Sequence, residues 1–367
     1  MKKNILFITP YTPSRLAAGE NFTKQVLAHF PDDYAVDLVY FSTRKNVYED
    51  VPDNVSVVYC CSVGRFSRLR MVLRQPWLFP LFSVRYSPEV VRLLRRLDRE
   101  KHYDLIYCDH AQTYIYGTLF PDRPKILMAH DVEVQRYSRR KIPFAASWCA
   151  WTECRLMRMP HAHILVFSEK DQRIVQEQYG LHSETVDFYL ESMISKTELH
   201  CTEDAAYVFF ANWSRPENTE GLAWFLKRVV PRLPPGLAIS VIGSGLSRPL
   251  QDELEKNGYR YWGFVADPYP LIANARALLA PIFHGAGVKV KVIEALACGT
   301  EVLGTSVAFE GIPERYESFL HFCEDAESFA DQIVRFHFSW ERKLKLRELS
   351  STAHRVYPVD IIRSLHK

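Results

Sequence analysis

The sequence lacks the signature motifs of several large enzyme classes. It has no G-x-x-x-x-G-K-[ST] phosphate loop, no H-E-x-x-H motif, no G-x-S-x-G nucleophile elbow and no set of protein-kinase motifs. These absences argue against most ATP-driven and serine-hydrolase chemistry. The run IGSG at residues 242–245 follows an expected strand but lacks the third glycine of a dinucleotide-binding loop, so we interpret it as a strand-to-helix turn.

A strong charge of one sign is also missing. The 367 residues include 46 basic and 43 acidic side chains, which leave a net charge of +3. Because the charges nearly cancel, the protein has no overall positive electrostatic field that would attract nucleic acid, and we expect no nucleic-acid partner. The eight cysteines form no C-x-x-C motif and lack the density of a secreted disulfide-rich domain. They predict reduced thiols and a cytoplasmic location.

Histidines in zinc-ligand spacing are equally absent. The candidates have no cysteine or histidine partner at the sequence separations that zinc sites use: His161, His163, His200 and His284. We therefore predict no bound metal, and packing or surface roles for these side chains.

No apolar run is long enough to cross a membrane. The aromatic stretch QPWLFPLFSV at residues 75–84 is broken by two prolines and is far shorter than the roughly 20 residues of a membrane span. It lies in the segment 65–101, which holds ten basic and three acidic residues. One interpretation is a basic amphipathic surface on the inner face of the cytoplasmic membrane. The other is a solvated helix packed on a sheet through Val90, Leu93, Leu94 and Leu97.

The chain does contain a regular alternation of short β-rich runs with helical periods. Runs such as NILFIT, DLIYC and HILVFS in the first half, and AYVFFA and LAISVIG in the second, are separated by helical stretches. This alternation predicts an α/β protein with parallel sheets. The pattern restarts near residue 198, and the length suits two domains. We predict domains at 1–198 and 199–349 facing each other across a cleft, with a C-terminal helix at about 350–367 packing back on the first.

The stretch PIFHGAGVKVKVIEALACGTEVLGTS, residues 281–306, places charged side chains at the entry to an apolar helix expected at about 288–298. Gly285 and Gly287 permit close approach of backbone to a ligand, and the helix start presents free N–H groups. The ammonium groups of Lys289 and Lys291 are unfavourable beside the positive end of the helix dipole unless a bound anion compensates their charge. The pattern therefore favours an anion site.

Glu294 has two interpretations on the residues alone. It can form an ion pair with Lys291, one turn earlier on a neighbouring face, with no further role. Alternatively, it accepts hydrogen bonds from the hydroxyls of a ribose.

Within this stretch, GAGVKVKVIEALACGTEVLGTSVAFEGI resembles the donor-binding signature of the retaining GT-B glycosyltransferases of family 4, the glycosyl transferases group 1. Upstream, FFANWSRPENTEGLAWFLKRVVPRL is similar to the opening of their second domain, and YWGFVADPYPLIANARALLAPI to the strand and loop that seat the base. MAHDVE and FSEKD extend the resemblance into the first half. The resemblance implies a GT-B fold, with two Rossmann-like domains.

The resemblance also implies roles for particular residues. Lys289 and Lys291 would face the diphosphate, and Glu294 the ribose hydroxyls. Phe264 and Val265 would contact the base through their backbone. Gly19 would lie in a loop on the phosphate side, and His130 beside the transferred sugar.

The sequence departs from the family pattern at two places. Relatives often carry a Glu-x7-Glu pair, but the position eight residues before Glu294 is Ala286, which leaves the identity of the sugar open. Relatives also often place an arginine and a lysine where this chain has Asn212 and Asn218, with Arg215 between them. Lys289 and Lys291 are expected to supply the missing charge.

The activity implied by the resemblance is metal-independent, retaining transfer of a hexosyl-type sugar (EC 2.4). The donor would be a nucleoside-diphosphate sugar, with UDP favoured over GDP, and the acceptor a glycan or lipid-linked hydroxyl in bacterial surface polysaccharide assembly. No cofactor is expected. Two alternatives remain: a catalytically silent GT-B scaffold or chaperone that partners an active transferase, and a sugar-nucleotide epimerase.

Overall fold

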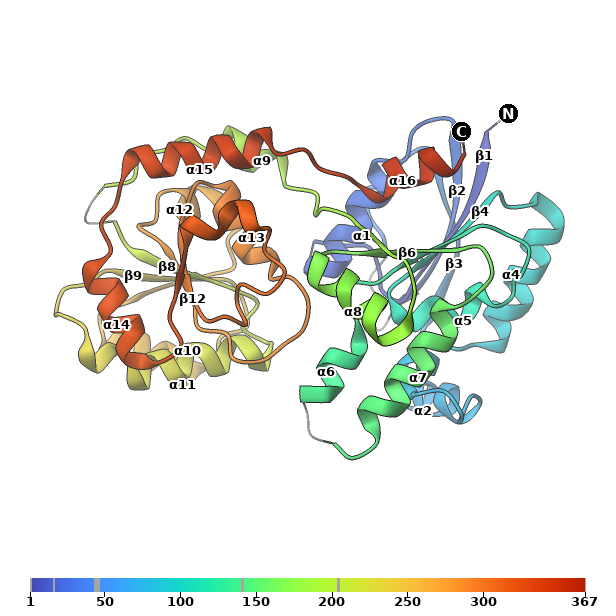
Figure 1. The fold of residues 1–367 in the computed structure, drawn as a ribbon, viewed down its shortest axis with the longest axis horizontal. Helices are drawn as coiled ribbons and strands as arrows, with labels where there is room; N and C mark the ends of the chain where they lie inside the picture. The colour runs from blue at the N-terminus through green and yellow to red at the C-terminus, as the bar shows by residue number, and fades with distance from the viewer. Residues whose placement is uncertain (1, 16, 43–46, 140–141, 203–204, 367) are drawn as a thin grey trace. The chain divides into compact units, whose positions relative to one another are not determined.

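The computed structural model describes residues 2–15, 17–42, 47–139, 142–202 and 205–366, and the chain divides into two compact units (Figure 1). Unit 1 comprises Met1–Tyr189 and Arg355–Lys367, and unit 2 comprises Leu190–His354. Each unit has a parallel β-sheet flanked by helices. The predicted α/β class with two Rossmann-like domains is therefore confirmed.

The sheet of unit 1 has seven strands in the order β3-β2-β1-β4-β5-β6-β7, all parallel. Its central strand is apolar on both faces: Ile5 to Ile8 are fully buried, as expected for a parallel sheet covered by helices. The strands are β1 (Lys3–Thr9), β2 (Tyr34–Ser42), β3 (Val55–Ser62), β4 (Leu105–Asp109), β5 (Lys125–Met128), β6 (Ala162–Val166) and β7 (Glu184–Thr185).

The helices of unit 1 connect these strands and include the C-terminal helix of the chain. They are α1 (Ala18–Ala28), α2 (Arg65–Leu73), α3 (Pro80–Ser83), α4 (Pro88–Lys101), η1 (Ala111–Thr113), α5 (Tyr114–Gly117), α6 (Glu133–Arg139), α7 (Ala145–Met157), α8 (Glu169–Tyr179) and α16 (Pro358–Leu365).

The sheet of unit 2 has six parallel strands in the order β10-β9-β8-β11-β12-β13. The strands are β8 (Tyr207–Phe210), β9 (Ile239–Ile242), β10 (Arg260–Gly263), β11 (Leu278–Ala280), β12 (Val302–Gly304) and β13 (Leu320–Phe322). The helices are α9 (Ser192–Lys196), α10 (Pro216–Arg228), η2 (Val230–Arg232), α11 (Arg248–Lys256), α12 (Tyr269–Ala273), α13 (Val290–Ala297), η3 (Glu314–Phe319), α14 (Ala326–Arg335) and α15 (Trp340–Thr352).

The boundary between the units lies after Tyr189, rather than near residue 198. Residues 190–198 carry α9, whose Ile194 is buried in the core of unit 2. At the other end, unit 2 runs to His354 instead of 349, because α15 continues to Thr352 and Ser350 is buried. The sequence around residues 190–198 is polar and has no strong periodicity, so it did not indicate that α9 packs in unit 2.

The last residues of the chain belong to unit 1. The backbone N–H of Asp187 donates to Val356 O at 2.8 Å, and the N–H of Val356 donates to Asp187 Oδ2 at 2.9 Å. At the far end, Lys3 Nζ donates to His366 O at 2.8 Å. On α16 itself, Ile362 is fully buried.

Helix α4 packs on the sheet, as one of the two interpretations of segment 65–101 predicted for its apolar residues. Val90, Leu94 and Leu97 are buried in the core of unit 1, and Leu93 packs against it. The helix begins with Pro88 in its first turn, where the missing N–H of proline is not needed. Among the described residues, no helix is both long and apolar enough to span a bilayer.

We expect Ile362→Ala to lower the free energy of unfolding by about 2–5 kcal/mol, because it leaves a cavity beneath α16. Ile361→Ala removes the same atoms from a half-buried neighbour on the same helix and should cost clearly less. Chemical denaturation followed by circular dichroism measures both. Equal losses in the two variants would show that α16 does not anchor the chain end through its buried face.

Candidate functional site

Both sheets reverse their strand order at one place, and several of the predicted site residues follow the strands at these places. In unit 2 the reversal falls between β8 and β11, and in unit 1 between β1 and β4. Open parallel sheets bind ligands outside the carboxyl ends of strands at such a switch point. Gly19 and His130 belong to unit 1, and the other predicted residues belong to unit 2.

In unit 2, the loop after β11 leads into α13 through two glycines with left-handed backbone. Gly285 has φ +127° and Gly287 has φ +67°, so other residues would be strained there. Lys289 is the N-cap, and α13 starts at Val290 and ends at Ala297, a shorter helix than the predicted 288–298. Lys289 Nζ donates to Gly287 O at 2.6 Å, which folds this ammonium over the loop.

Lys291, in the first turn of α13, contacts the start of α10, the helix that follows β8. Its Nζ donates to Asn218 Oδ1 at 2.7 Å, and Asn218 Nδ2 donates to Asn212 O at 2.8 Å. Asn212 and Asn218 are the positions where the sequence departs from the family pattern, and the structure makes Asn218 the neutral partner of the ammonium. Arg215, the N-cap of α10, is exposed.

In the part of the chain that the structure describes, the ammonium of Lys291 forms no ion pair with a carboxylate. Burial lowers the pKa of Lys291 to about 7; Glu217 opposes this effect, while Lys289 and Arg215 add to it by repulsion. The side chain also lines a narrow hollow together with Asn218 and Trp213. This electrostatic setting favours the arrival of an anion.

Glu294 does not pair with Lys291, so the interpretation of these two residues as an ion pair is wrong. Its Oε1 accepts a hydrogen bond from the Tyr269 hydroxyl at 3.0 Å. Burial raises the pKa of Glu294 to about 7, with a further contribution from Glu191 and an opposing one from the Tyr269 bond. Its hydrogen-bond partner comes from α12, a helix that the sequence pattern did not connect with it.

Phe264 and Val265 lie in the loop between β10 and α12. The Phe264 ring is 75% exposed, whereas Val265 packs partly against the core of unit 2. The same loop continues to Tyr269, which holds Glu294. The residues predicted to contact a base and those predicted to contact a ribose are thus linked through one segment.

Two close approaches of backbone shape this end of unit 2. A Cβ on Gly221 of α10 would lie 2.0 Å from Pro281 O, so only glycine lets α10 approach the loop after β11. A Cβ on Gly243 would lie 1.8 Å from Ala211 O, and Trp213 Nε1 donates to Ile242 O at 3.0 Å. The IGSG run is therefore a turn packed on the β8 loop, with α11 following from Arg248.

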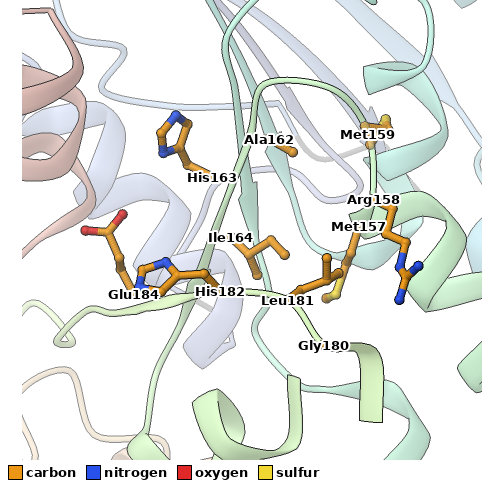
Figure 2. A pocket seen from close by; sticks show the side chains of 10 residues that line it. All are labelled: Met157, Arg158, Met159, Ala162, His163, Ile164, Gly180, Leu181, His182 and Glu184. Atoms are coloured by element: carbon orange, nitrogen blue, oxygen red, sulfur yellow. The ribbon is translucent and has the colours of Figure 1, made fainter. Parts of the chain in front are cut away.

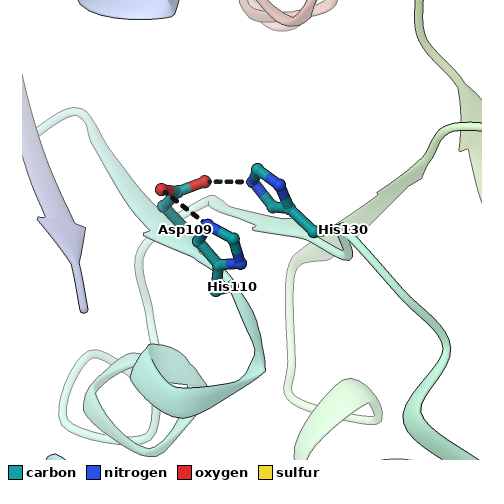
Figure 3. A group of neighbouring side chains, drawn as sticks. All are labelled: Asp109, His110 and His130. Atoms are coloured by element: carbon teal, nitrogen blue, oxygen red, sulfur yellow. Dashed lines mark hydrogen bonds and ion pairs between the residues drawn. The ribbon is translucent and has the colours of Figure 1, made fainter. Parts of the chain in front are cut away.

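In unit 1, Asp109 at the end of β4 holds His130, which follows β5 (Figure 3). Asp109 Oδ1 lies 2.8 Å from His130 Nε2, while Oδ2 accepts from Thr23 Oγ1 at 2.6 Å and from Thr9 Oγ1 at 2.9 Å. Burial raises the pKa of Asp109, but His110, His130 and the Thr23 bond outweigh it and hold the pKa at about 2. An ionised carboxylate only accepts, so His130 Nε2 donates and its Nδ1 is left as the second ring nitrogen.

His110 completes this cluster. Its ring stacks on His130 with centroids 3.4 Å apart, and its backbone has φ +60°, a left-handed conformation that is uncommon outside glycine. Burial lowers the pKa of His110 to about 3, which His130 reinforces and Asp109 opposes, so the ring is neutral. A Cβ on Gly19 would lie 3.0 Å from His110 Cε1 and 3.5 Å from His130 Nδ1. Gly19 and His130, predicted separately, are therefore neighbours.

Asp109, His110 and His130 are also the one group among the described residues whose ligand atoms lie close enough to hold a metal, within 4.8 Å of one another. Histidine spacing in the sequence gave no sign of it, because parallel strands rather than local spacing bring the residues together. Both oxygens of Asp109 already accept hydrogen bonds from the protein. The buried Nε2 of His110, in contrast, has no hydrogen-bond partner among the described residues.

A depression of about 640 Å³ in unit 1 lies elsewhere (Figure 2). It is lined by residues at the start of β6 and β7, including His163, His182 and Glu184. Since the strands are parallel, this is the amino edge of the sheet, opposite the edge that carries Asp109. It contains none of the predicted site residues.

Comparison with known proteins agrees with this architecture. Residues 205–337 match the family model of glycosyl transferases group 1. The crystal structure of Anabaena Alr3699/HepE in complex with UDP and glucose superimposes with a TM-score of 0.68 at 14% identity, covering 99% of both chains. That of WaaG, a glycosyltransferase involved in lipopolysaccharide biosynthesis, has a TM-score of 0.68 at 12% identity and covers 98% of both.

One curated relative is an uncharacterized 44.6 kDa protein in the cps region of Klebsiella pneumoniae. It is 24% identical over 274 residues, which cover 66% of this chain and 68% of the relative. Residues 205–337 of unit 2 thus resemble a glycosyl transferases group 1 domain, and the chain as a whole has the GT-B fold.

We expect Asp109→Asn to lose about 2 kcal/mol of stability at neutral pH, as a pKa held about two units low implies. A carboxyl group with a depressed folded-state pKa stabilises the fold above its unfolded pKa of about 4 and loses that contribution as the pH falls toward 2. The difference in unfolding free energy between wild type and variant should therefore shrink over this window.

Asp171→Asn provides the control, because burial raises the pKa of this buried carboxyl. Its ionised form opposes folding, so the pH trend should have the opposite sign. A parallel trend in the two variants would contradict the assignment of Asp109 as an ionised acceptor.

Proposed function

We propose that the protein is a retaining glycosyltransferase that moves a sugar from a nucleoside-diphosphate sugar to a hydroxyl of a glycan or lipid-linked acceptor. The observation that carries this proposal is the half-buried ammonium of Lys291 near a switch point, whose one hydrogen-bond partner among the described residues is the Asn218 amide. The group 1 domain supports it. UDP is favoured as the nucleoside diphosphate, because the structurally similar Anabaena protein was crystallised with UDP.

The diphosphate would bind at the start of α13. There the free N–H groups of the first turn and the ammonium groups of Lys289 and Lys291 offer positive charge to the leaving group. As the bond to the sugar breaks, negative charge grows on the bridging oxygen, and groups already in place stabilise it without reorganisation. The glycines of the preceding loop allow phosphate oxygens to approach the backbone.

The nucleoside would lie along the segment that links Glu294 to β10. The Glu294 carboxylate, held by Tyr269, accepts hydrogen bonds from ribose hydroxyls. Backbone groups at Phe264 and Val265 contact the base. Because burial raises the pKa of Glu294 to about 7, hydroxyl donors would stabilise its ionised form.

His130 would orient the transferred sugar. Asp109 accepts from Nε2 and fixes the ring, so that Nδ1, on the side of Gly19, can accept a hydrogen bond from a sugar hydroxyl. Asp109 is then a positioning residue. The acceptor proton passes to the leaving diphosphate on the same face, so retention of configuration requires no protein base.

The reaction as proposed uses no metal and no cofactor beyond the donor. Cationic side chains and the start of α13 supply the charge that a metal would otherwise supply. The donor sugar stays open, since Ala286 offers no side-chain carboxylate to its hydroxyls. The cps-region relative and WaaG support a place in bacterial surface polysaccharide assembly on the cytoplasmic side of the membrane.

UDP affinity should fall as the pH rises above about 7. The free protein holds Lys291 with a lowered pKa, and a bound diphosphate favours the charged ammonium and raises that pKa, so binding takes up a proton. Above this pH the affinity should decline by up to about tenfold per pH unit. Titration calorimetry in two buffers of different ionisation enthalpy measures the uptake.

Lys291→Met should remove both the proton uptake and the pH dependence, whereas Lys345→Met, an exposed lysine on α15, should change neither. A wild-type affinity that stays constant between pH 7 and pH 9, over about two units, would contradict a lysine with a lowered pKa at the diphosphate.

Acceptor-dependent release of UDP from UDP-sugars should fall about 10² to 10³-fold in Lys291→Ala, remain unchanged in Lys345→Ala and persist in EDTA. The assay follows UDP by a coupled reaction, with GDP-sugars for comparison. Background activity in both wild type and variant would indicate a silent scaffold. Conversion of the sugar without an acceptor would indicate an epimerase, and loss of activity in EDTA would contradict metal independence.

A further inference from the structure

Helix α7 of unit 1 presents a stripe of aromatic rings to solvent. Trp148, Trp151 and Arg155 stand at successive spacings of three and four on α7 and therefore share one helix face, and Phe144 is the N-cap residue just before the helix. Phe144 is 88% exposed and Trp151 49% exposed, while Cys149 and other residues of the opposite face are buried. An ordinary surface helix has the reverse pattern, with its aromatic residues facing the core.

Helix α2 and the segment after it extend this stripe. Leu69 and Leu73, one turn apart on α2, are exposed, and Trp77 is 57% exposed. The segment is fixed to α7, since Trp148 Nε1 donates to Trp77 O at 3.0 Å and Thr152 Oγ1 accepts from the Phe79 N–H at 3.0 Å. We name this surface the aromatic face: Leu69, Leu73, Trp77, Phe144, Trp148 and Trp151.

The charge around the aromatic face is positive. The exposed arginines of these two segments are Arg68, Arg70, Arg74, Arg155 and Arg158. The sequence has no acidic residue between Asp53 and Glu89, and Glu153, the acidic residue of α7, is fully buried with its carboxylate bonded to Tyr179. No exposed carboxylate on these segments offsets the arginines.

Phe144 adds evidence of another kind. Its backbone has φ +61°, a left-handed conformation that costs free energy for a bulky residue. The structure thus holds a large ring in solvent at the start of α7, in an unfavourable conformation. Because the Phe144 side chain is 88% exposed, it buries little apolar surface that would offset this cost.

We propose that the aromatic face docks on the surface of an anionic lipid bilayer. Tryptophan and phenylalanine rings partition into the interfacial region, and arginines beside them bind lipid phosphates. The arrangement places α2 and α7 along the membrane plane. This inference does not rest on the proposed reaction. It also moves the contact away from α4, whose apolar residues are buried and whose arginines are interspersed with Glu89, Asp98 and Glu100.

Co-sedimentation of the full chain with vesicles tests the proposal. Wild type should bind vesicles of mixed phosphatidylcholine and phosphatidylglycerol, bind phosphatidylcholine alone far more weakly, and lose binding as salt rises. Its tryptophan emission should shift to the blue on binding. Arg70→Gln with Arg74→Gln should weaken partition roughly 30-fold, and Trp151→Ser with Phe144→Asn should weaken it at least about tenfold. Asparagine tolerates the left-handed backbone at this position.

Matched controls keep the result specific. Arg92→Gln with Arg95→Gln removes the same charge from α4, and Trp340→Ser removes an exposed indole from α15 of unit 2; both should bind as wild type does. Thermal unfolding confirms that each variant folds. Failure of wild type to bind anionic vesicles, equal loss in the α4 pair, or self-association through the aromatic face instead of vesicle binding would overturn the proposal. UDP affinity, measured in parallel, tests the proposed function separately.

Discussion

The hydrogen bond between Lys291 Nζ and Asn218 Oδ1 is the interaction on which the account of the site depends. It joins α10 to α13, the helices that follow β8 and β11, and these are the two strands at which the sheet of unit 2 reverses its order. The partner is a neutral amide, which positions the ammonium without neutralising its charge. Burial at the same time lowers the pKa of Lys291. An ion pair at this place would satisfy the lysine and leave little reason to bind an anion. The close approach of Gly221 to Pro281 is what allows α10 to bring Asn218 there.

Much of this architecture was predictable from the sequence. The predictions that were wrong or missing depend on contacts between residues far apart in the chain. Alternating periods predict two parallel sheets, and the glycine-lysine stretch predicts a charged helix entry, because both are local patterns. Asp109 was missed although it directly precedes a histidine at a strand end, since its partnership with His130 arises from neighbouring parallel strands. The pairing of Glu294 with Tyr269 likewise joins α13 to α12 across 25 residues. Local spacing favoured Lys291 as the partner, and tertiary packing decided otherwise.

The basic segment 65–101 shows the same limit in another way. Its net charge and aromatic run were visible in the sequence, but the sequence left open whether its apolar residues pack on the sheet or face a membrane. The structure buries the apolar face of α4 and exposes Leu69, Leu73 and Trp77. It also adds α7, some 70 residues further along the chain, whose tryptophans carry no charge signature of their own. A surface built from two distant segments is defined only once the fold is known.

The most direct test of the central claim is a crystal structure of the protein with UDP bound. The account predicts diphosphate oxygens within hydrogen-bond distance of Lys291 Nζ and of the first N–H groups of α13, with Glu294 contacting the ribose. Phosphate density at another place, or a Lys291 ammonium that keeps Asn218 as its partner and does not contact the ligand, would contradict it.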